Sequence, residues 1–208
     1  MNGPLSVGVL VSGSGTNLQA LLDSVHGNEA RIVGVASSSE GAPALQRARD
    51  AGVPARAFPM SDFEGRALRD EAIADWLAGS GATLVVLAGY MQLLGAGFLR
   101  RFPGAVINVH PSLLPAFPGI RAIEQALDHG VRVTGVTVHF VDEGVDTGPI
   151  ILQRAIEIDP TMDAEQVHER LRHAEHELLP EAVRLFAGGR LSEDPANRRR
   201  VLINPAGQ

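Results

Sequence analysis

The chain has 208 residues and a formal net charge of −6, with 24 acidic and 18 basic residues, and this balance argues against the basic footprint of a nucleic-acid-binding domain. It contains no Cys, which excludes a disulfide framework, a thiolate nucleophile and a Cys-ligated zinc ion. All 18 basic residues are Arg, and because Lys is absent the chain is neither a P-loop NTPase nor a Schiff-base enzyme.

The first half of the chain alternates short β-branched runs with longer helical patterns, as in βαβ units on a parallel sheet. The predicted strands are 5–11, 31–37, 53–58, 83–88 and 105–109, and the predicted helices are 17–25, 43–51 and one that begins at a capping-box spacing over 61–64 and runs through 76–78. Residues 133–141 and 150–158 predict an antiparallel strand pair, and a helix over 163–186 follows. The predicted fold class is therefore α/β, an open, mostly parallel twisted sheet with helices on both faces.

Residues 1–189 are predicted to form one domain, and the polar residues 190–208 a loosely held tail. No apolar run reaches the ~18 residues that a membrane span needs, and the first four residues lack the pattern of a signal peptide. We therefore expect a cytoplasmic protein that binds small molecules, with no membrane or nucleic-acid partner; a homodimer is left open.

A glycine-rich segment, Ser12-Gly13-Ser14-Gly15, lies between the first predicted strand and helix. Thr16 and Gln19 have capping-box spacing, so Thr16 is expected to cap that helix, whose free amides and positive dipole end suit a phosphate. The dinucleotide fingerprint fails because its third Gly falls on Leu18. The segment favours a mononucleotide-phosphate site, with a plain structural turn as the alternative.

Asn108 and His110 end a predicted buried strand, two residues apart, so both side chains are expected on the same side of the sheet's carboxyl edge. A rigid loop containing Pro111, Pro115 and Pro118 follows. A carboxylate near the imidazole, for which Asp146 is the candidate, would raise the pKa of His110 and keep it cationic beside the Asn amide. Two such donors suit an oxyanion in acyl transfer. Taken singly, each residue also fits a structural role.

His139 has two interpretations: it orients Asp146, or it is a buried polar residue, and the second is favoured. The His residues of the last predicted helix lack the His-Glu-x-x-His pattern, so no metal is expected.

Four segments carry a resemblance to a known family. They read Ser-Gly-Ser-Gly-Thr-Asn-Leu from Ser12, Leu-Ala-Gly-Tyr-Met from Leu87, Ile-Asn-Val-His-Pro-Ser-Leu-Leu-Pro-Ala-Phe-Pro-Gly from Ile107, and Val-His-Phe-Val-Asp-Glu-Gly-Val-Asp-Thr-Gly-Pro-Ile from Val138. In this order, over about residues 7–189, the chain resembles the phosphoribosylglycinamide formyltransferases, the folate-dependent glycinamide ribonucleotide transformylases of purine synthesis. The resemblance implies a Rossmann-like fold and 10-formyltetrahydrofolate as co-substrate.

The resemblance also implies roles for matching residues. Gly15, Thr16 and Asn17 correspond to the loop that holds the ribose phosphate, and Glu175 to a residue that contacts the ribonucleotide. The catalytic set corresponds to Asn108, His110 and Asp146. The folate contacts correspond to Arg66, Met91, Gln92, Leu93, Leu94, Asn108 and Val141, with Leu87, Phe98 and Val106 as further apolar walls for the pterin. Many relatives carry Arg where this chain has Gln92.

The function implied is transfer of a formyl group from 10-formyltetrahydrofolate to the amine of glycinamide ribonucleotide. We expect direct attack by the amine without an acyl-enzyme, because no activated Ser or Cys is available. A formyltetrahydrofolate hydrolase normally carries an extra N-terminal domain, for which a first strand at about Leu5 leaves no room, and methionyl-tRNA formyltransferase needs a further C-terminal domain and a basic surface. A non-catalytic nucleotide-binding regulator could use the same glycine segment.

Overall fold

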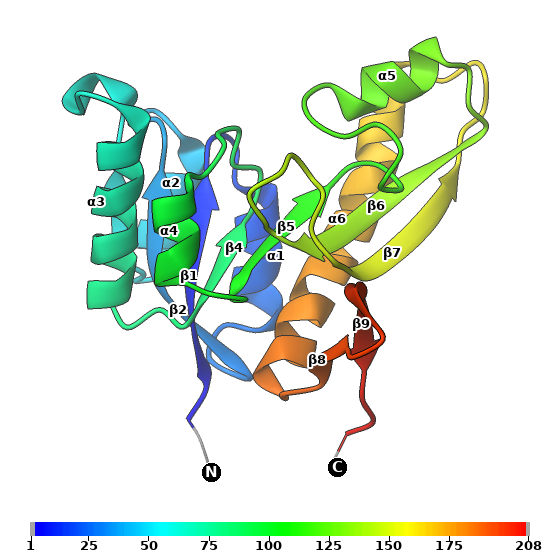
Figure 1. Ribbon diagram of the computed structural model, residues 1–208. Helices are drawn as coiled ribbons and strands as arrows, with labels where there is room; N and C mark the ends of the chain where they lie inside the picture. Colours follow the sequence, from blue (N-terminus) through cyan, green and yellow to red (C-terminus); the bar gives the residue numbers. More distant parts are fainter. Residues whose placement is uncertain (1–2, 207–208) are drawn as a thin grey trace. The chain divides into compact units, whose positions relative to one another are not determined.

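The structure is a computed structural model that describes residues 3–206. The chain folds as two compact units, the first ending at Asn108 and the second beginning at Val109 (Figure 1). Parallel strands and crossover helices make up the first unit, whereas the second contains antiparallel strand pairs and the 24-residue helix α6.

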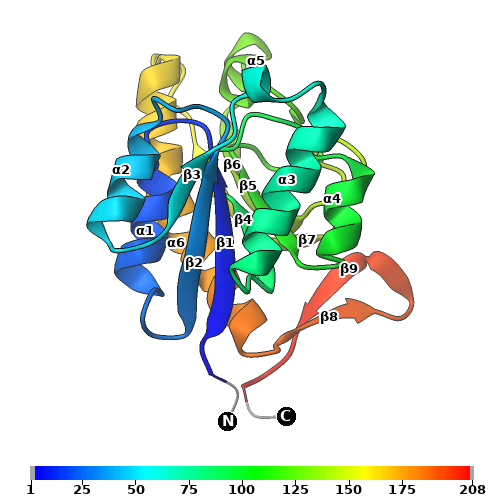
Figure 2. The same cartoon turned by 90° about the vertical axis from the view of Figure 1, so that its left-hand side faces the viewer.

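The strands of the first unit run parallel to one another in the order β3-β2-β1-β4-β5, and β5 continues past Asn108 into the second unit. Their bounds are β1 Leu5–Val11, β2 Ala30–Ser37, β3 Ala55–Ala57, β4 Leu84–Leu87 and β5 Val106–His110. The helices are α1 Thr16–Ser24, α2 Pro43–Asp50, α3 Arg66–Gly79 and α4 Ala96–Arg101, with a short 3-10 helix, η1 Met60–Asp62, before α3. Figure 2 shows α1 and α2 on one face of these strands and α3 and α4 on the other. Every residue of β4 is buried, as expected for a strand covered on both faces.

The second unit contains α5 Ala122–Asp128, β6 Val133–Phe140, β7 Ile150–Glu157, α6 Ala164–Ala187, β8 Leu191–Asp194 and β9 Asn197–Ile203. β6 pairs with β7 in antiparallel fashion, and β9 meets β7 in parallel where Arg200 lies opposite Ile150. α6 packs on β6 and β7, and Asp163 begins it with a capping box, in which the Asp163 side chain accepts from Gln166 N and the Gln166 side chain from Asp163 N.

The predicted α/β class and the strands and helices expected from hydrophobic period are confirmed within a few residues. Two predicted helix starts are wrong. Thr16 does not cap α1, since it is the first helical residue and Gly15 is the N-cap. The capping-box spacing over 61–64 begins no α-helix; residues 60–62 form η1, and α3 starts at Arg66 after an extended Gly65.

The structure differs from the sequence predictions in further segments that the hydrophobic periodicity of the sequence does not reveal. The short helices α4 and α5 were not predicted, because six or seven residues carry too little of a 3.6-residue period to be distinguished from a loop. The tail expected to be loosely held instead forms β8 and β9, which pair with each other in antiparallel fashion.

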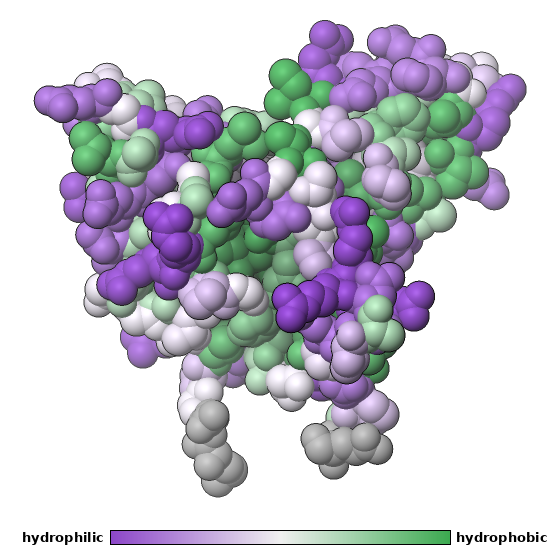
Figure 3. Space-filling model, viewed as in Figure 1, coloured by the Kyte–Doolittle hydropathy of each residue, from purple (hydrophilic) through white to green (hydrophobic). Residues whose placement is uncertain are grey.

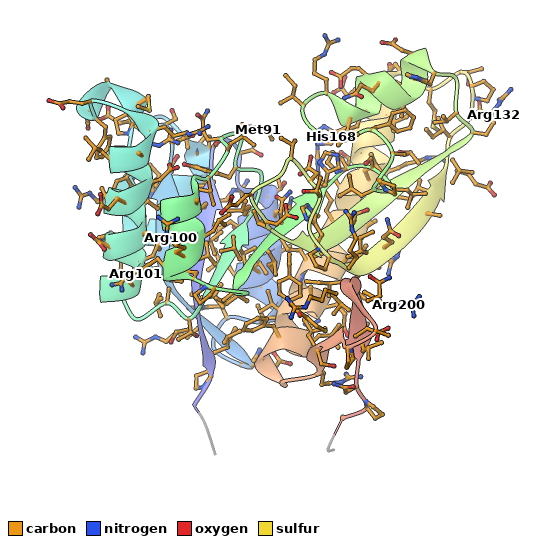
Figure 4. All side chains as sticks on the ribbon, in the orientation of Figure 1. Met91, Arg100, Arg101, Arg132, His168 and Arg200 are labelled. Atoms are coloured by element: carbon orange, nitrogen blue, oxygen red, sulfur yellow. The ribbon has the colours of Figure 1, made fainter. Side chains whose placement is uncertain are left out.

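The outer surface of the first unit is largely polar over α3 and α4. In Figure 3 it is deepest purple where Figure 4 labels Arg100 and Arg101, the last two residues of α4. Within residues 3–206, no helix combines the length and apolar character needed to cross a membrane.

Gly135 in β6 provides a test of packing in the second unit. A Cβ at this position would lie 2.1 Å from the carbonyl oxygen of Arg154 and 2.6 Å from Cδ2 of Leu113, so the backbone itself would have to move. We expect Gly135→Ala to lower the free energy of unfolding by about 1–3 kcal/mol or more, measured by urea denaturation. The matched control is Gly79→Ala at the end of α3, where a Cβ meets nothing within 4 Å and a gain of up to about 1 kcal/mol is expected. Equal stability of the two variants would contradict the close packing of β6.

Candidate active site

The glycine loop, Ser12 to Gly15, connects β1 to α1. Gly15 has φ of +75°, and a Cβ there would lie 2.6 Å from Cβ of Ala44, so glycine is required both for the left-handed backbone and for the approach of α2. Gly15, as the N-cap residue, supplies no side-chain acceptor to the first turn of α1. The start of α1 therefore has the properties of a helix N-terminal anion site.

Side chains from neighbouring segments hold the glycine loop in shape. The Ser12 hydroxyl lies 2.8 Å from that of Ser38 and accepts from the amide of Met91 at 3.0 Å. Arg47 Nε donates to the carbonyl oxygen of Ser14 at 2.8 Å, which places a guanidinium beside the loop. Sequence reasoning restricted a phosphate site to backbone amides, helix ends or Arg, but no sequence signal distinguishes Arg47 from the other Arg residues.

His110 ends β5 and is 5% exposed. Its Nε2 lies 2.9 Å from the carbonyl oxygen of Phe117, and because that oxygen only accepts, Nε2 carries the hydrogen. Its Nδ1 lies 3.4 Å from Oδ2 of Asp146, so the predicted pairing of this imidazole with that carboxylate is present. Asn108 lies two residues earlier on β5, and the strand period directs its side chain to the same side as that of His110.

The proline loop that follows His110 is anchored to β6 and β7. Thr137 Oγ1 donates to the carbonyl oxygen of Ser112 at 2.7 Å and accepts from the amide of Leu114 at 3.1 Å. Gln153 Nε2 donates to the carbonyl oxygen of Leu114 at 2.9 Å. Ser112 and Thr137 are fully buried. The loop therefore presents Phe117 to His110 from a fixed base.

Asp146 lies in the turn between β6 and β7, residues 141–149, and has φ of +53°, a left-handed conformation that Asp tolerates better than most residues. Asp142 stabilises this turn by accepting from the amide of Gly144 at 3.0 Å and from the hydroxyl of Thr147 at 2.6 Å. Arg199 on β9 donates to the carbonyl oxygen of Thr147 at 3.1 Å. The C-terminal hairpin thus contacts the turn that carries the carboxylate.

The Asp146 carboxylate is shared by three groups. Oδ2 accepts from the amide of Gly119 at 2.7 Å and faces His110, whereas Oδ1 lies 3.6 Å from Nε2 of His139. The Nδ1 of His139 lies 2.8 Å from the carbonyl oxygen of Phe140, and the residue is 1% exposed. The favoured interpretation of His139 as merely a buried polar residue is therefore incomplete, since its ring faces Asp146 and fixes one carboxylate oxygen.

Burial and hydrogen bonding act in opposite directions on the two pKa values of the pair. Burial raises the pKa of Asp146, but the hydrogen bonds from His139 and Gly119 and the charge of His110 outweigh it and hold the pKa below its ordinary 3.8. For His110, burial lowers the pKa below 6.5 and outweighs the opposing effects of Phe117 and Asp146. Desolvation therefore outweighs the expected effect of Asp146 on His110, and the pKa of the imidazole shifts downward instead of upward.

The residues expected to contact folate lie in separate segments. Met91 to Leu94 form a loop after β4, which Figure 4 marks by Met91; Met91 and Leu93 are 69% and 54% exposed. Arg66, the first residue of α3, is exposed, and Val141 follows β6. Of the other expected walls, Leu87, Phe98 and Val106 are buried in the first unit. Glu175, expected to contact the ribonucleotide, is 7% exposed on α6.

Parallel strands with crossover helices define an α/β protein, and the carboxylate of Asp146 lies between the imidazoles of His110 on β5 and His139 on β6. Within residues 3–206 no group of three or more His, Asp or Glu is placed to hold a metal ion. The chain belongs to the formyl transferase family, whose model matches residues 5–183.

This chain is similar over most of its length to proteins of known sequence and structure. It is 40% identical over 187 residues to phosphoribosylglycinamide formyltransferase of Haemophilus influenzae, covering 89% of this chain and 88% of that protein. It is 43% identical to the trifunctional purine biosynthetic protein adenosine-3 of Drosophila melanogaster, with 88% of this chain covered, and it spans only 14% of that protein's length. The crystal structure of glycinamide ribonucleotide transformylase 1 from Symbiobacterium toebii superposes with a TM-score of 0.93 at 47% identity, covering 97% of this chain and 95% of that one.

The lowered pKa of His110 predicts a specific pH dependence of stability. Because the unfolded imidazole binds a proton at higher pH than the folded one, the free energy of unfolding falls as pH falls from about 6.5 toward the lowered pKa. We expect His110→Asn, which cannot titrate, to lack this decline, so the stability advantage of the parent chain over the variant shrinks on acidification. Denaturant unfolding of both chains between pH 8 and pH 5 measures this difference in the free energy of unfolding. An advantage that grows on acidification would instead show a cationic His110.

Proposed function

We propose that this chain transfers the formyl group of 10-formyltetrahydrofolate to the amine of N1-(5-phospho-D-ribosyl)glycinamide, a step of de novo purine synthesis. Residues 1–189 would form the formyltransferase domain of a cytoplasmic enzyme. The observation that carries the proposal is the Asp146 carboxylate held against His110, two residues after Asn108 on β5, in a chain of the formyl transferase family.

The site chemistry fits a formyl donor that is already activated. 10-Formyltetrahydrofolate supplies a formyl carbon bonded to a nitrogen that leaves as an amine. The reaction forms a bond from the ribonucleotide nitrogen to that carbon, breaks the bond to the folate nitrogen, and moves one proton from the first nitrogen to the second. The chain therefore has to stabilise charge on the formyl oxygen and carry one proton.

Asn108 and His110 would supply these functions. The donors for the formyl oxygen would be the Asn108 amide and the Nε2–H of His110. In this structure the Nε2–H of His110 faces the carbonyl oxygen of Phe117. As negative charge develops on the formyl oxygen, it raises the pKa of His110, and Asp146 stabilises the imidazolium form. His110, or a water held by Asp146, then passes the proton to the leaving nitrogen.

The substrates would be held by groups away from the reacting atoms. The start of α1, at Gly15, Thr16 and Asn17, would bind the ribose phosphate, with Arg47 beside the loop, and Glu175 would contact the ribonucleotide. For the folate we propose Arg66, Met91, Gln92, Leu93, Leu94, Asn108 and Val141. The 91–94 loop fits an amphipathic aromatic ligand, since exposed apolar Met91 and Leu93 flank a carboxamide.

A product assay tests the function. Incubation with both substrates should yield the formylated ribonucleotide and tetrahydrofolate in equal amounts, and omission of the ribonucleotide should stop tetrahydrofolate formation. Formate release without the ribonucleotide would indicate a hydrolase. Binding of the ribonucleotide without turnover would indicate a nucleotide-binding regulator.

Asp146→Asn tests the catalytic cluster. The variant keeps the shape of the side chain but removes the charge that stabilises an imidazolium, so we expect kcat to fall about 100–1000-fold while the KM for the ribonucleotide changes little. Asp142→Asn, in the same turn, is the matched control, because its amide oxygen can still accept from Gly144 and Thr147. Equal turnover of the two variants would remove Asp146 from catalysis.

Asn17→Ala tests the phosphate site. Asn17 lies in the first turn of α1 and is 7% exposed, so its loss should raise the KM for the ribonucleotide several-fold and leave the KM for 10-formyltetrahydrofolate unchanged. Asn28→Ala, in the exposed turn after α1, is the control with the same change of side chain. A rise in the folate KM alone would show that the phosphate has been assigned to the wrong loop.

A further inference from the structure

A buried guanidinium lies behind the loop that follows β4. Arg69 on α3 is 1% exposed, and its Nη2 donates to Oδ1 of the neighbouring Asp70 at 3.0 Å. Oδ2 of Asp70 accepts from the amide of Gly95 at 2.9 Å, so the same carboxylate also fixes the far end of the loop. A buried ion pair of this kind is costly to form and costly to break on one side, so each charge depends on the other.

The surroundings of Arg69 include buried polar atoms without a hydrogen-bond partner in the described part of the chain. The Nε of Arg69 has no hydrogen-bond partner within residues 3–206, and the same holds there for the buried hydroxyl of Tyr90. Burial raises the pKa of Tyr90 to about 12, with Arg69 opposing that rise, so the hydroxyl is neutral and adds no negative charge. The charge of Arg69 is therefore balanced by the carboxylate of Asp70 and not by Tyr90.

The other terminal nitrogen of the Arg69 guanidinium, Nη1, faces Gln92. Arg69 Nη1 lies 3.4 Å from Oε1 of Gln92, a long hydrogen bond. Because a guanidinium only donates, the Gln92 carboxamide has to turn its oxygen toward Arg69, which directs its NH2 group away from it. A cation at position 92 would bring two guanidinium groups together with one carboxylate between them. This accounts for a neutral side chain at position 92.

We propose that Arg69 is a positioning residue for the formyl donor: it orients the Gln92 carboxamide so that the 91–94 loop presents a neutral N–H donor, between Met91 and Leu93, to a carbonyl or ring acceptor of the folate. The proposal rests on the proposed function. It makes the contact at residue 92 an uncharged hydrogen bond and keeps the cation inside the protein, paired with Asp70.

A double-mutant cycle tests the pairing. Arg69→Leu leaves Asp70 buried without its cation, and we expect a lower melting temperature and a KM for 10-formyltetrahydrofolate raised about tenfold, the equivalent of ~1.4 kcal/mol. Gln92→Arg alone should act in the same direction through repulsion. The double variant Arg69→Leu/Gln92→Arg restores one cation beside Asp70, so both its melting temperature and its folate KM should lie closer to the parent values than those of either single variant.

Further readouts separate positioning from a general loss of structure. Arg69→Lys, which keeps the charge, should have a folate KM between those of the parent and Arg69→Leu, and the ribonucleotide KM of both Arg69 variants should stay within about twofold of the parent. Arg101→Leu is the control with an Arg-to-Leu change, because Arg101 is exposed and its nearest carboxylate, on Asp75, is 3.9 Å away.

The outcomes are distinguishable from failure of the proposed function. Additive effects of the two substitutions, or equal rises in both KM values, would overturn the positioning role. Calorimetric titration of the parent chain with folic acid reports on the folate site independently of turnover. If the two substitutions have non-additive effects on the melting temperature but the parent chain does not bind folic acid, the ion pair is purely structural and the inference is overturned. If the parent chain binds folic acid but transfers no formyl group, only the proposed function is overturned.

Discussion

The Asp146 carboxylate lies between two imidazoles and a backbone amide, and these contacts join the proline loop, β6 and the turn after β6. Each oxygen has its own imidazole, His110 on Oδ2 and His139 on Oδ1. The other nitrogen of each ring faces a carbonyl oxygen, which only accepts, so the rings cannot turn without losing a hydrogen bond. The donors that converge on the carboxylate hold its pKa below the ordinary value, while burial lowers the pKa of His110 despite the carboxylate beside it.

Loops carry this cluster, yet each loop is tied to a regular element. Thr137 of β6 and Gln153 of β7 hold the proline loop that presents Phe117, and Asp142 holds the turn that presents Asp146. The left-handed backbone of Asp146 is maintained by these surroundings, since a conformation of this kind persists only where neighbouring contacts determine it. Rigid anchoring of this sort is what a site needs to keep donors aimed at a reacting atom.

Because the chain has no Lys, every positively charged side chain other than His is an Arg, and several Arg residues donate to backbone carbonyl oxygens or to a carboxylate. Arg47 donates to the glycine loop and Arg199 to the Asp146 turn, while Arg69 pairs with Asp70 behind the 91–95 segment. A planar guanidinium offers five donors in a fixed fork, so it can hold a carbonyl oxygen and a side chain at once. The Arg content thus has a structural meaning in addition to its effect on net charge.

Periodicity in the sequence was sufficient to determine the α/β class and the bounds of β1, β6 and α6 to within a residue or two, because long amphipathic or fully apolar runs commit the backbone locally. Motif spacing also identified Asn108, His110 and Asp146 as candidates. The short helix α4 and the start of α3 depended on tertiary contacts, such as the bond from Gly95 to Asp70, that no local pattern specifies.

The electrostatics of the site depend on the folded arrangement of the chain. The sequence predicts that a histidine follows a buried strand and that an aspartate occupies a turn 36 residues later. It could not determine that burial outweighs the carboxylate at His110, that His139 faces the same carboxylate, or that Arg69 faces Gln92. Desolvation and hydrogen-bond geometry depend on which groups from distant segments surround a side chain, and that arrangement exists only in the folded chain.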